Sequence, residues 1–308
     1  MAKTNKQYWA DRELEAIKNR ITDDEKMKRE LEAIYKTASR DIDREIYNFY
    51  ARYATREGIT IQEAQKRASR MDVEAFAERA KQYVKEKDFS DKANEELALY
   101  NLKMKVSRLE LLSEQLNLIL TGLYDEQTSY LYGQFNEAAR KEAERQAGIL
   151  GKGTQLSRKD LEAVVNGSFK VGDFSDNIWA DKDALRTKLM QQVTQSIIMG
   201  EHPTKLAGKL ADELGVSRRN AVRILRTEVG QVLIAQQAEN YRENGIEYYQ
   251  IIREPSACKY CKQMGEDSES IDGAPKYKVS EMVQGVNAPL FHPNCRCSTV
   301  PVVKYPYK

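Results

Sequence analysis

Apolar residues recur at every third or fourth position along most of the chain, a period that predicts α-helices. The first long run is expected to begin at a capping box, Thr22-Asp-Asp-Glu25, and to end at Gly58. Its apolar positions are Leu31, Tyr35, Ala38, Ile42, Ile46, Phe49 and Tyr53. Shorter amphipathic helices are expected over 61–69 and 72–85. All of these segments are predicted to be helical.

A second run of apolar residues keeps a spacing similar to that of a coiled coil over three heptads. Its members are Leu102, Val106, Leu109, Leu112, Leu116, Ile119 and Leu123. Such a run forms either the core of a helical bundle or a surface for self-association, and the bundle core is the commoner outcome. Because residues 8–146 contain no proline, we expect residues 1–150 to form an elongated helical arm or bundle.

The helical pattern is interrupted at Gly148-Ile-Leu-Gly-Lys-Gly153, which predicts a hinge or domain boundary. Residues 151–245 then form a helical middle region. An amphipathic helix is expected over 181–199, followed by a compact helix over 203–214. Ser217 is expected to cap a further long helix that ends near residue 244.

The period changes after Gly245, where residues 246–253 are enriched in β-branched and aromatic side chains. This composition predicts a strand, and residues 299–303 are its expected antiparallel partner. Residues 246–308 are therefore predicted to form a small α/β module at the end of a mainly α protein.

Charge excludes some classes of partner. The 308 residues include 49 Lys and Arg against 47 Asp and Glu, a formal net charge of +2, so strong global attraction to nucleic acid or to an anionic membrane is not expected. The N-terminus lacks the apolar core of a signal peptide, and polar residues interrupt the apolar stretch 109–123. We expect a protein that is made in the cytoplasm and makes no membrane contact.

The chemistry is concentrated in the last fifth of the chain. All four cysteines lie there, in Cys258-Lys-Tyr-Cys261 and in His292-Pro-Asn-Cys295-Arg-Cys297. Two such half-sites can supply the four tetrahedral ligands of a structural Zn²⁺ ion. We favour Cys258, Cys261, His292 and Cys295, with Cys297 as the spare, although the spacing leaves open which of the last two cysteines ligates. Two disulfides and unligated thiols are the alternatives, and the absence of a secretory signal disfavours disulfides.

A catalytic metal is the sharper alternative, in a zinc-dependent nucleic-acid enzyme. The chain has only two histidines, His202 and His292, and it lacks the upstream His-x-Glu of the zinc deaminases. With four protein ligands at hand, no coordination position needs to stay open, so we expect no enzymatic activity. The triplet Arg226-Thr227-Glu228 is either an ion-pairing or a catalytic element of its helix, and ion pairing is commoner.

The C-terminal half resembles the phage head morphogenesis family, also called the Mu F-like minor head proteins. The resemblance covers about residues 175–302. It rests on Trp179, the helix before Gly200, the 206–214 helix, Arg226-Thr227-Glu228, Cys258-x-x-Cys261 and His292-Pro-Asn-Cys295-Arg-Cys297. The closing string is the most specific of these elements, and the first half of the chain is only loosely consistent with the family's variable N-terminal regions.

The resemblance implies a minor capsid protein of the virion, present in few copies in the head interior or near the portal. Expected partners are the portal protein and other head proteins, with non-specific DNA contact described for some members. The implied role is structural, in head morphogenesis, DNA packaging or DNA delivery. Some relatives carry a further toxin domain; this chain ends at Lys308, so none is expected. A dedicated DNA-binding module remains a second alternative.

Overall fold

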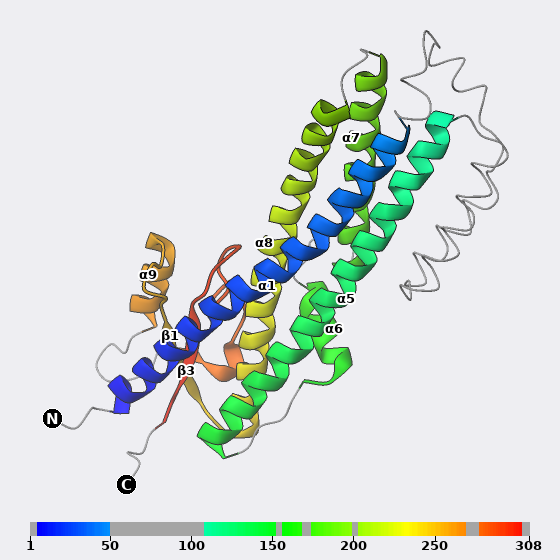
Figure 1. The fold of residues 1–308 in the computed structure, drawn as a ribbon. Coiled ribbons are helices and arrows are strands. Elements are labelled where there is room, and N and C mark those ends of the chain that lie inside the picture. Colours follow the sequence, from blue (N-terminus) through cyan, green and yellow to red (C-terminus); the bar gives the residue numbers. More distant parts are fainter. Residues whose placement is uncertain are drawn as a thin grey trace. The chain divides into compact units, whose positions relative to one another are not determined.

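The protein is mainly α-helical, as predicted, with a small sheet near the C-terminus (Figure 1). The computed structural model describes residues 5–49, 108–151, 156–167, 174–198, 203–268 and 277–303. The helices in these ranges are α1 (Asn5–Phe49), α5 (Arg108–Leu150), α6 (Arg158–Gly167), α7 (Phe174–Ile198), α8 (Pro203–Glu243) and α9 (Lys259–Asp267). The helices predicted over 61–69 and 72–85, together with Gly58 and His202, lie outside the described residues. Within the ranges given, no helix offers a stretch apolar enough to span a bilayer.

The chain divides into two compact units, each assembled from separate parts of the sequence. Unit 1 comprises residues 1–29, 131–174 and 221–308, and unit 2 comprises 30–130 and 175–220. Helices α1, α5 and α8 each contribute residues to both units. The predicted boundaries near 150 and 245 fall close to the ends of α5 and α8. The division of the chain into regions 1–150, 151–245 and 246–308 stays a prediction.

The predicted start of a helix at Thr22 is wrong, because α1 runs without a break from Asn5 to Phe49. The Thr22 hydroxyl donates to the carbonyl of Lys18, as a threonine does inside a helix. Asp24 and Glu25 contact arginines from distant parts of unit 1 instead of capping a helix. The apolar period nevertheless located the buried face correctly. Leu31, Tyr35, Ala38, Ile42 and Ile46 are all buried.

The predicted break before Ser217 is also wrong, since α8 continues through Gly215 and Ser217 to Glu243. Ser217 is buried and its hydroxyl lies within unit 2 at the centre of a polar cluster. Its Oγ is 2.9 Å from the Tyr35 hydroxyl, 2.6 Å from the Tyr124 hydroxyl, and donates to Asp181 Oδ2 at 2.8 Å. Tertiary hydrogen bonds from α1, α5 and α7 thus engage the hydroxyl that would otherwise cap a helix.

Removal of this hydroxyl is expected to destabilise unit 2. The Ser217→Ala variant leaves two buried phenols and a carboxylate with one hydrogen-bond partner fewer, at a cost of about 1–3 kcal/mol. Thermal unfolding followed by circular dichroism measures the change. Ser129→Ala is the matched control, because Ser129 is exposed on α5. Equal unfolding midpoints for the two variants would contradict a role for the cluster.

Unit 1 contains a three-stranded antiparallel sheet in the order β2-β1-β3, with β1 (Tyr248–Ile252), β2 (Tyr277–Lys278) and β3 (Ser298–Val302). The predicted pairing of the segment after Gly245 with the segment near residue 300 is confirmed. Tyr248 lies opposite Val302, and Ile252 lies opposite Ser298. A 3₁₀ turn (Val279–Glu281) follows β2.

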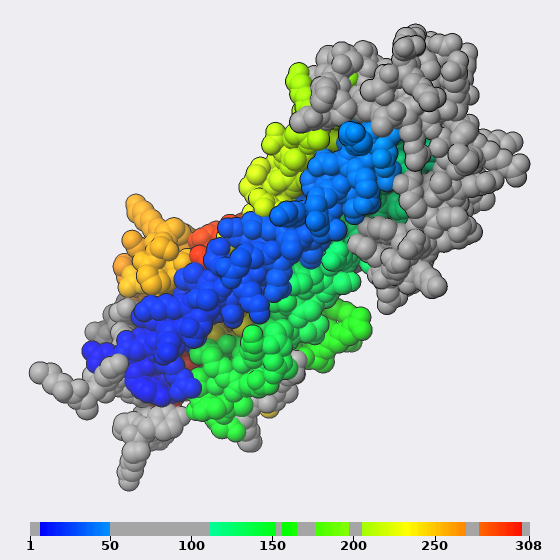
Figure 2. Space-filling view, in the orientation of Figure 1, coloured from blue at the N-terminus to red at the C-terminus, as the bar shows by residue number. Residues whose placement is uncertain are grey.

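A buried polar network joins β3 to three helices of unit 1. Ser298 Oγ donates to Glu13 Oε1 of α1 at 2.6 Å, and Gln237 Nε2 of α8 donates to Glu142 Oε1 of α5 at 2.9 Å. One nitrogen of Arg145 lies 2.8 Å from Glu13 and 2.7 Å from Glu142. The N-terminal part of α1 passes across the strands in Figure 1, and these bonds show that the contact is direct. In Figure 2 the same part of α1, in dark blue, lies between α9 and the end of α5.

Candidate metal centre

The first half-site lies at the start of α9, a helix that the sequence analysis did not anticipate. Cys258 is the N-cap residue, and its sulfur accepts a 3.5 Å hydrogen bond from the backbone N–H of Cys261. Cys261 lies in the first turn of the helix and is buried, whereas Cys258 is exposed. A helix start therefore sets the direction of both sulfurs and offers backbone N–H groups to the anionic thiolate.

The second half-site lies on the loop that leads into β3. The antiparallel register places the end of β1 opposite the beginning of β3, with Ile252 beside Ser298. The segment that leaves β1 toward Cys258 and the segment that enters β3 after Cys297 consequently meet at the same end of the sheet. This topology explains how half-sites more than thirty residues apart in sequence come together.

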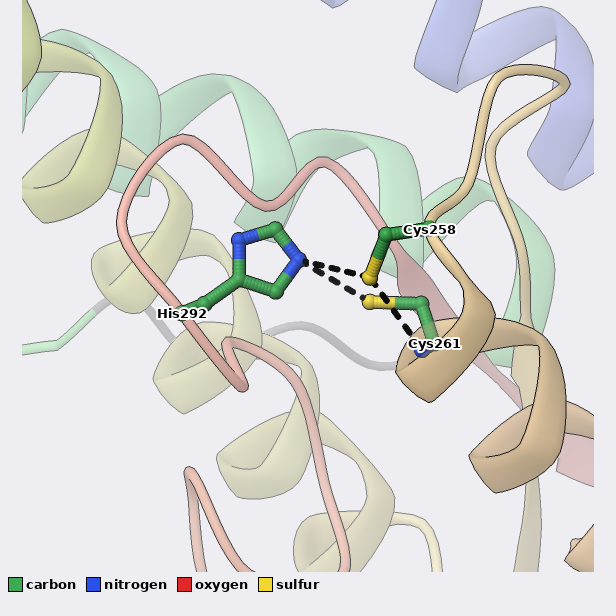
Figure 3. A group of neighbouring side chains, drawn as sticks. All are labelled: Cys258, Cys261 and His292. Carbon is green, nitrogen blue, oxygen red and sulfur yellow. Dashed lines mark hydrogen bonds between the residues drawn. The ribbon is translucent and has the colours of Figure 1, made fainter.

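The ligand atoms of the two half-sites lie at the spacing of a metal site (Figure 3). The Nε2 atom of His292 is 3.4 Å from Cys258 Sγ and 3.2 Å from Cys261 Sγ, and Cys261 Sγ is 3.7 Å from Cys295 Sγ. Zn–S and Zn–N bonds of about 2.3 and 2.0 Å put the ligand atoms of a tetrahedral zinc site about 3.5–3.8 Å apart. The three distances found here are close to that spacing.

Two overlapping groups of donors could hold a metal ion. Cys258, Cys261 and His292 form the first group, and Cys261, Cys295 and Cys297 form the second. In each group the ligand atoms lie within 4.8 Å of one another. All five predicted residues are thus brought together, and Cys261 is shared by both groups.

The orientation of His292 suits a metal ligand. Its Nδ1 lies 2.9 Å from the carbonyl oxygen of Pro293. A carbonyl can only accept, so Nδ1 carries the proton and Nε2 presents its lone pair to the sulfurs. The same hydrogen bond raises the pKa of His292. Ligating histidines commonly have their second nitrogen fixed in this way.

The cysteines differ in how readily they form thiolates. A hydrogen bond with Cys297 lowers the pKa of Cys295 to about 6, and a hydrogen bond from the Cys261 backbone lowers the pKa of Cys258. Burial raises the pKa of Cys261 to about 12. The hydrogen bond with Cys295 likewise raises the pKa of Cys297. Thiolates this close together repel one another, so fewer of the sulfurs can be ionised without a cation than with one. This is the electrostatic property expected of a cation site.

The site has a hydrophobic environment. Cys261, Cys295 and Cys297 belong to a buried cluster with Tyr249 and Ile251 of β1, and the cluster includes Ile234 and Tyr241 of α8. The C-terminal module therefore shares a core with α8, because the last third of that helix turns apolar side chains toward the sheet.

The Arg226-Thr227-Glu228 triplet lies on α8 in unit 1. Arg226 pairs with Glu25 at 2.9 Å and lies 3.6 Å from Asp24 Oδ2. The ion-pairing interpretation of Arg226 is therefore confirmed. Thr227 Oγ1 accepts a hydrogen bond from the backbone N–H of Asn294, inside the second half-site. That contact was not anticipated, because nothing in the sequence links residues 227 and 294.

Comparison with known proteins identifies one similar family. Residues 187–300 match the family model described as Phage Mu protein F like protein. The matched segment contains all five candidate ligands and the whole of α8. It lies within the region, about 175–302, over which the sequence resemblance was noted. No curated protein and no solved structure matches the chain.

Proposed function

We propose that this protein is a phage head morphogenesis protein, because residues 187–300 match the family model described as Phage Mu protein F like protein. More specifically, we propose a minor capsid protein that associates with the portal and serves head assembly, DNA packaging or DNA delivery. The single observation that carries the proposal is the match over the segment that holds all five candidate ligands. Its place would be the virion, in the head interior or near the portal, with other head proteins as partners.

We propose that the centre binds a structural Zn²⁺ ion through Cys258, Cys261, His292 and Cys295. The donor set is soft, and the histidine tautomer leaves Nε2 free to ligate. Cys295 lies at a ligand–ligand distance from Cys261, whereas Cys297 is placed to hydrogen-bond Cys295. Four protein ligands leave no open position for a substrate, which supports a role in assembly over catalysis.

The head assignment is tested by mass spectrometry of purified procapsids and mature particles of the phage that encodes the protein. The expected result is a few copies per portal in both kinds of particle. Presence in procapsids alone would indicate an assembly factor lost at maturation. Absence from both would contradict the virion assignment and return attention to a zinc-dependent nucleic-acid enzyme.

A further inference from the structure

The loop that carries the second half-site rests on one face of α8. Thr227 Oγ1 accepts a 3.3 Å hydrogen bond from the Asn294 N–H, between the ligands His292 and Cys295. One turn further along α8, Leu290 packs against Gly230, where a Cβ atom would come within 2.7 Å of the leucine side chain. In the next position, the backbone carbonyl of Gln231 accepts a 2.8 Å hydrogen bond from Gln284.

Helix α1 holds the same loop from a second direction. Arg296, between Cys295 and Cys297, donates from Nε to Asp24 Oδ2 at 2.8 Å. Arg226 of α8 lies 3.6 Å from the same carboxylate oxygen and pairs with Glu25. Asp24 is therefore an anion between two arginines, Arg226 on α8 and Arg296 on the 292–297 loop.

The Asp24 carboxylate is largely removed from water, with a residue exposure of 8 %. Burial raises its pKa, and Arg296 and Arg226 oppose that effect. A buried carboxylate is costly without cationic partners, so its ion pairs favour the folded arrangement in which Arg296 stays beside α1. The positions on either side of Arg296 are both cysteines, and the direction of the arginine constrains the backbone that aims them.

We propose that Asp24, Arg226 and Thr227 form a seat that holds the 292–297 loop in its metal-binding conformation before the metal arrives. These three are positioning residues, since none of them is among the candidate ligands of the ion. The inference rests on the metal centre proposed above and adds that its affinity is set partly from α1, 272 residues distant from Arg296. It also means that metal binding and the docking of α1 onto the C-terminal strands stabilise each other, because linkage is reciprocal.

The conformation of Asn294 shows why a seat is needed. Its φ angle is +64°, in the left-handed region that non-glycine residues seldom adopt. This backbone turn lets His292 and Cys295 face the same point, and the Cys295 N–H bonds back to the His292 carbonyl at 3.1 Å. The bond from Asn294 to Thr227 offsets the cost of the turn at the residue that bears it.

The test measures Zn²⁺ affinity of the full chain by competition with a chelator of known affinity. Thr227→Val removes the hydroxyl at nearly constant shape, and Asp24→Asn removes the charge. Each variant is expected to bind Zn²⁺ roughly 10-fold more weakly than the wild type, the lower end of the effect seen for residues that orient ligands.

Matched controls separate the seat from general effects of the substitutions. Thr187→Val removes a hydroxyl that donates to the carbonyl four residues earlier, as Thr227 also does, but on α7. Asp41→Asn removes a carboxylate that pairs with Arg44 on α1. Both controls are expected to keep wild-type affinity. Far-UV circular dichroism establishes that each variant retains its helices.

The outcomes are distinct. Wild-type Zn²⁺ affinity in both seat variants would overturn the seat while leaving the metal centre intact. A wild type that binds no Zn²⁺ would overturn the metal centre and the seat together. Hydrogen exchange of the metal-free wild type gives a measurement that needs no variant. Slow exchange in the peptide 289–298 is expected, and complete exchange within seconds would refute a preformed loop even if the variants misfold.

Discussion

Replacing Cys261 by serine is expected to abolish tight Zn²⁺ binding and to release α9 and the 292–297 loop from each other. Cys261 belongs to both donor groups, so its loss leaves three ligands whichever of the last two cysteines completes the site. Structural zinc contributes about 10–16 kcal/mol of apparent binding free energy in zinc-finger peptides. A loss of even about 3 kcal/mol would lower the unfolding midpoint of unit 1, which has about 160 residues, by about 6–12 °C.

Zinc content by elemental analysis and thermal unfolding measure the two effects on the same samples. Cys258→Ser and His292→Ala are expected to behave like Cys261→Ser, while the helices of unit 2 remain formed. Cys295→Ser should also lose the metal, whereas Cys297→Ser should retain it. If Cys295→Ser instead retained the metal and Cys297→Ser lost it, Cys297 would be the fourth ligand. Unchanged zinc content in Cys261→Ser would remove the metal centre altogether.

Replacing Arg145 by methionine is expected to be the most destabilising change outside the metal centre. Glu13 and Glu142 are buried, with exposures of 3 % and 5 %, and Arg145 lies between them. Burial alone would raise the pKa of Glu142, and Arg145 reverses that effect and holds it below its ordinary value. Without Arg145, Glu142 loses its ion pair and Glu13 keeps only Arg20, at 2.9 Å, so the expected cost is about 3–5 kcal/mol. Urea unfolding of the zinc-saturated protein measures this loss.

Arg140→Met is the control on the same helix. Arg140 is exposed and pairs with Glu137 and Glu144, so its removal is expected to leave the unfolding midpoint unchanged. The pH dependence adds a second check. A depressed carboxyl pKa stabilises the fold above the unfolded value of 4.5 and stops doing so as the pH falls through the folded value. The stability gap between wild type and Arg145→Met should therefore narrow below pH 4.5, and a constant gap would contradict the ionic explanation.

The periodic pattern of apolar residues determined which faces of the helices are buried. Leu112, Leu116, Ile119 and Leu123 are buried as their spacing predicts. Helix boundaries were harder to predict from the sequence. A capping residue is recognised from its neighbours in sequence, but its hydroxyl or carboxylate can instead bond to residues distant in sequence. Ser217 joins a buried cluster with Tyr35 and Tyr124 in place of a helix cap.

The five metal-capable residues were determined by the sequence alone, since cysteine occurs nowhere else in the chain. The strand pairing that brings the two half-sites together could also be predicted from composition, because β-branched and aromatic residues are enriched in both strands. Helix α9 was not, because nine polar-rich residues between Cys258 and Ser268 give too short a run for helical periodicity to stand out.

Only the tertiary structure showed what holds the second half-site in place. Asp24 and Arg296 are 272 positions apart, and Thr227 is 67 positions from Asn294. No local pattern encodes such pairs, because the sequence around a charged helical residue is the same whether its side chain faces water or a distant loop. Residue types and their spacing therefore determined which side chains of this protein could bind a metal. The packing of α1 and α8 against the 292–297 loop decided how those side chains are positioned.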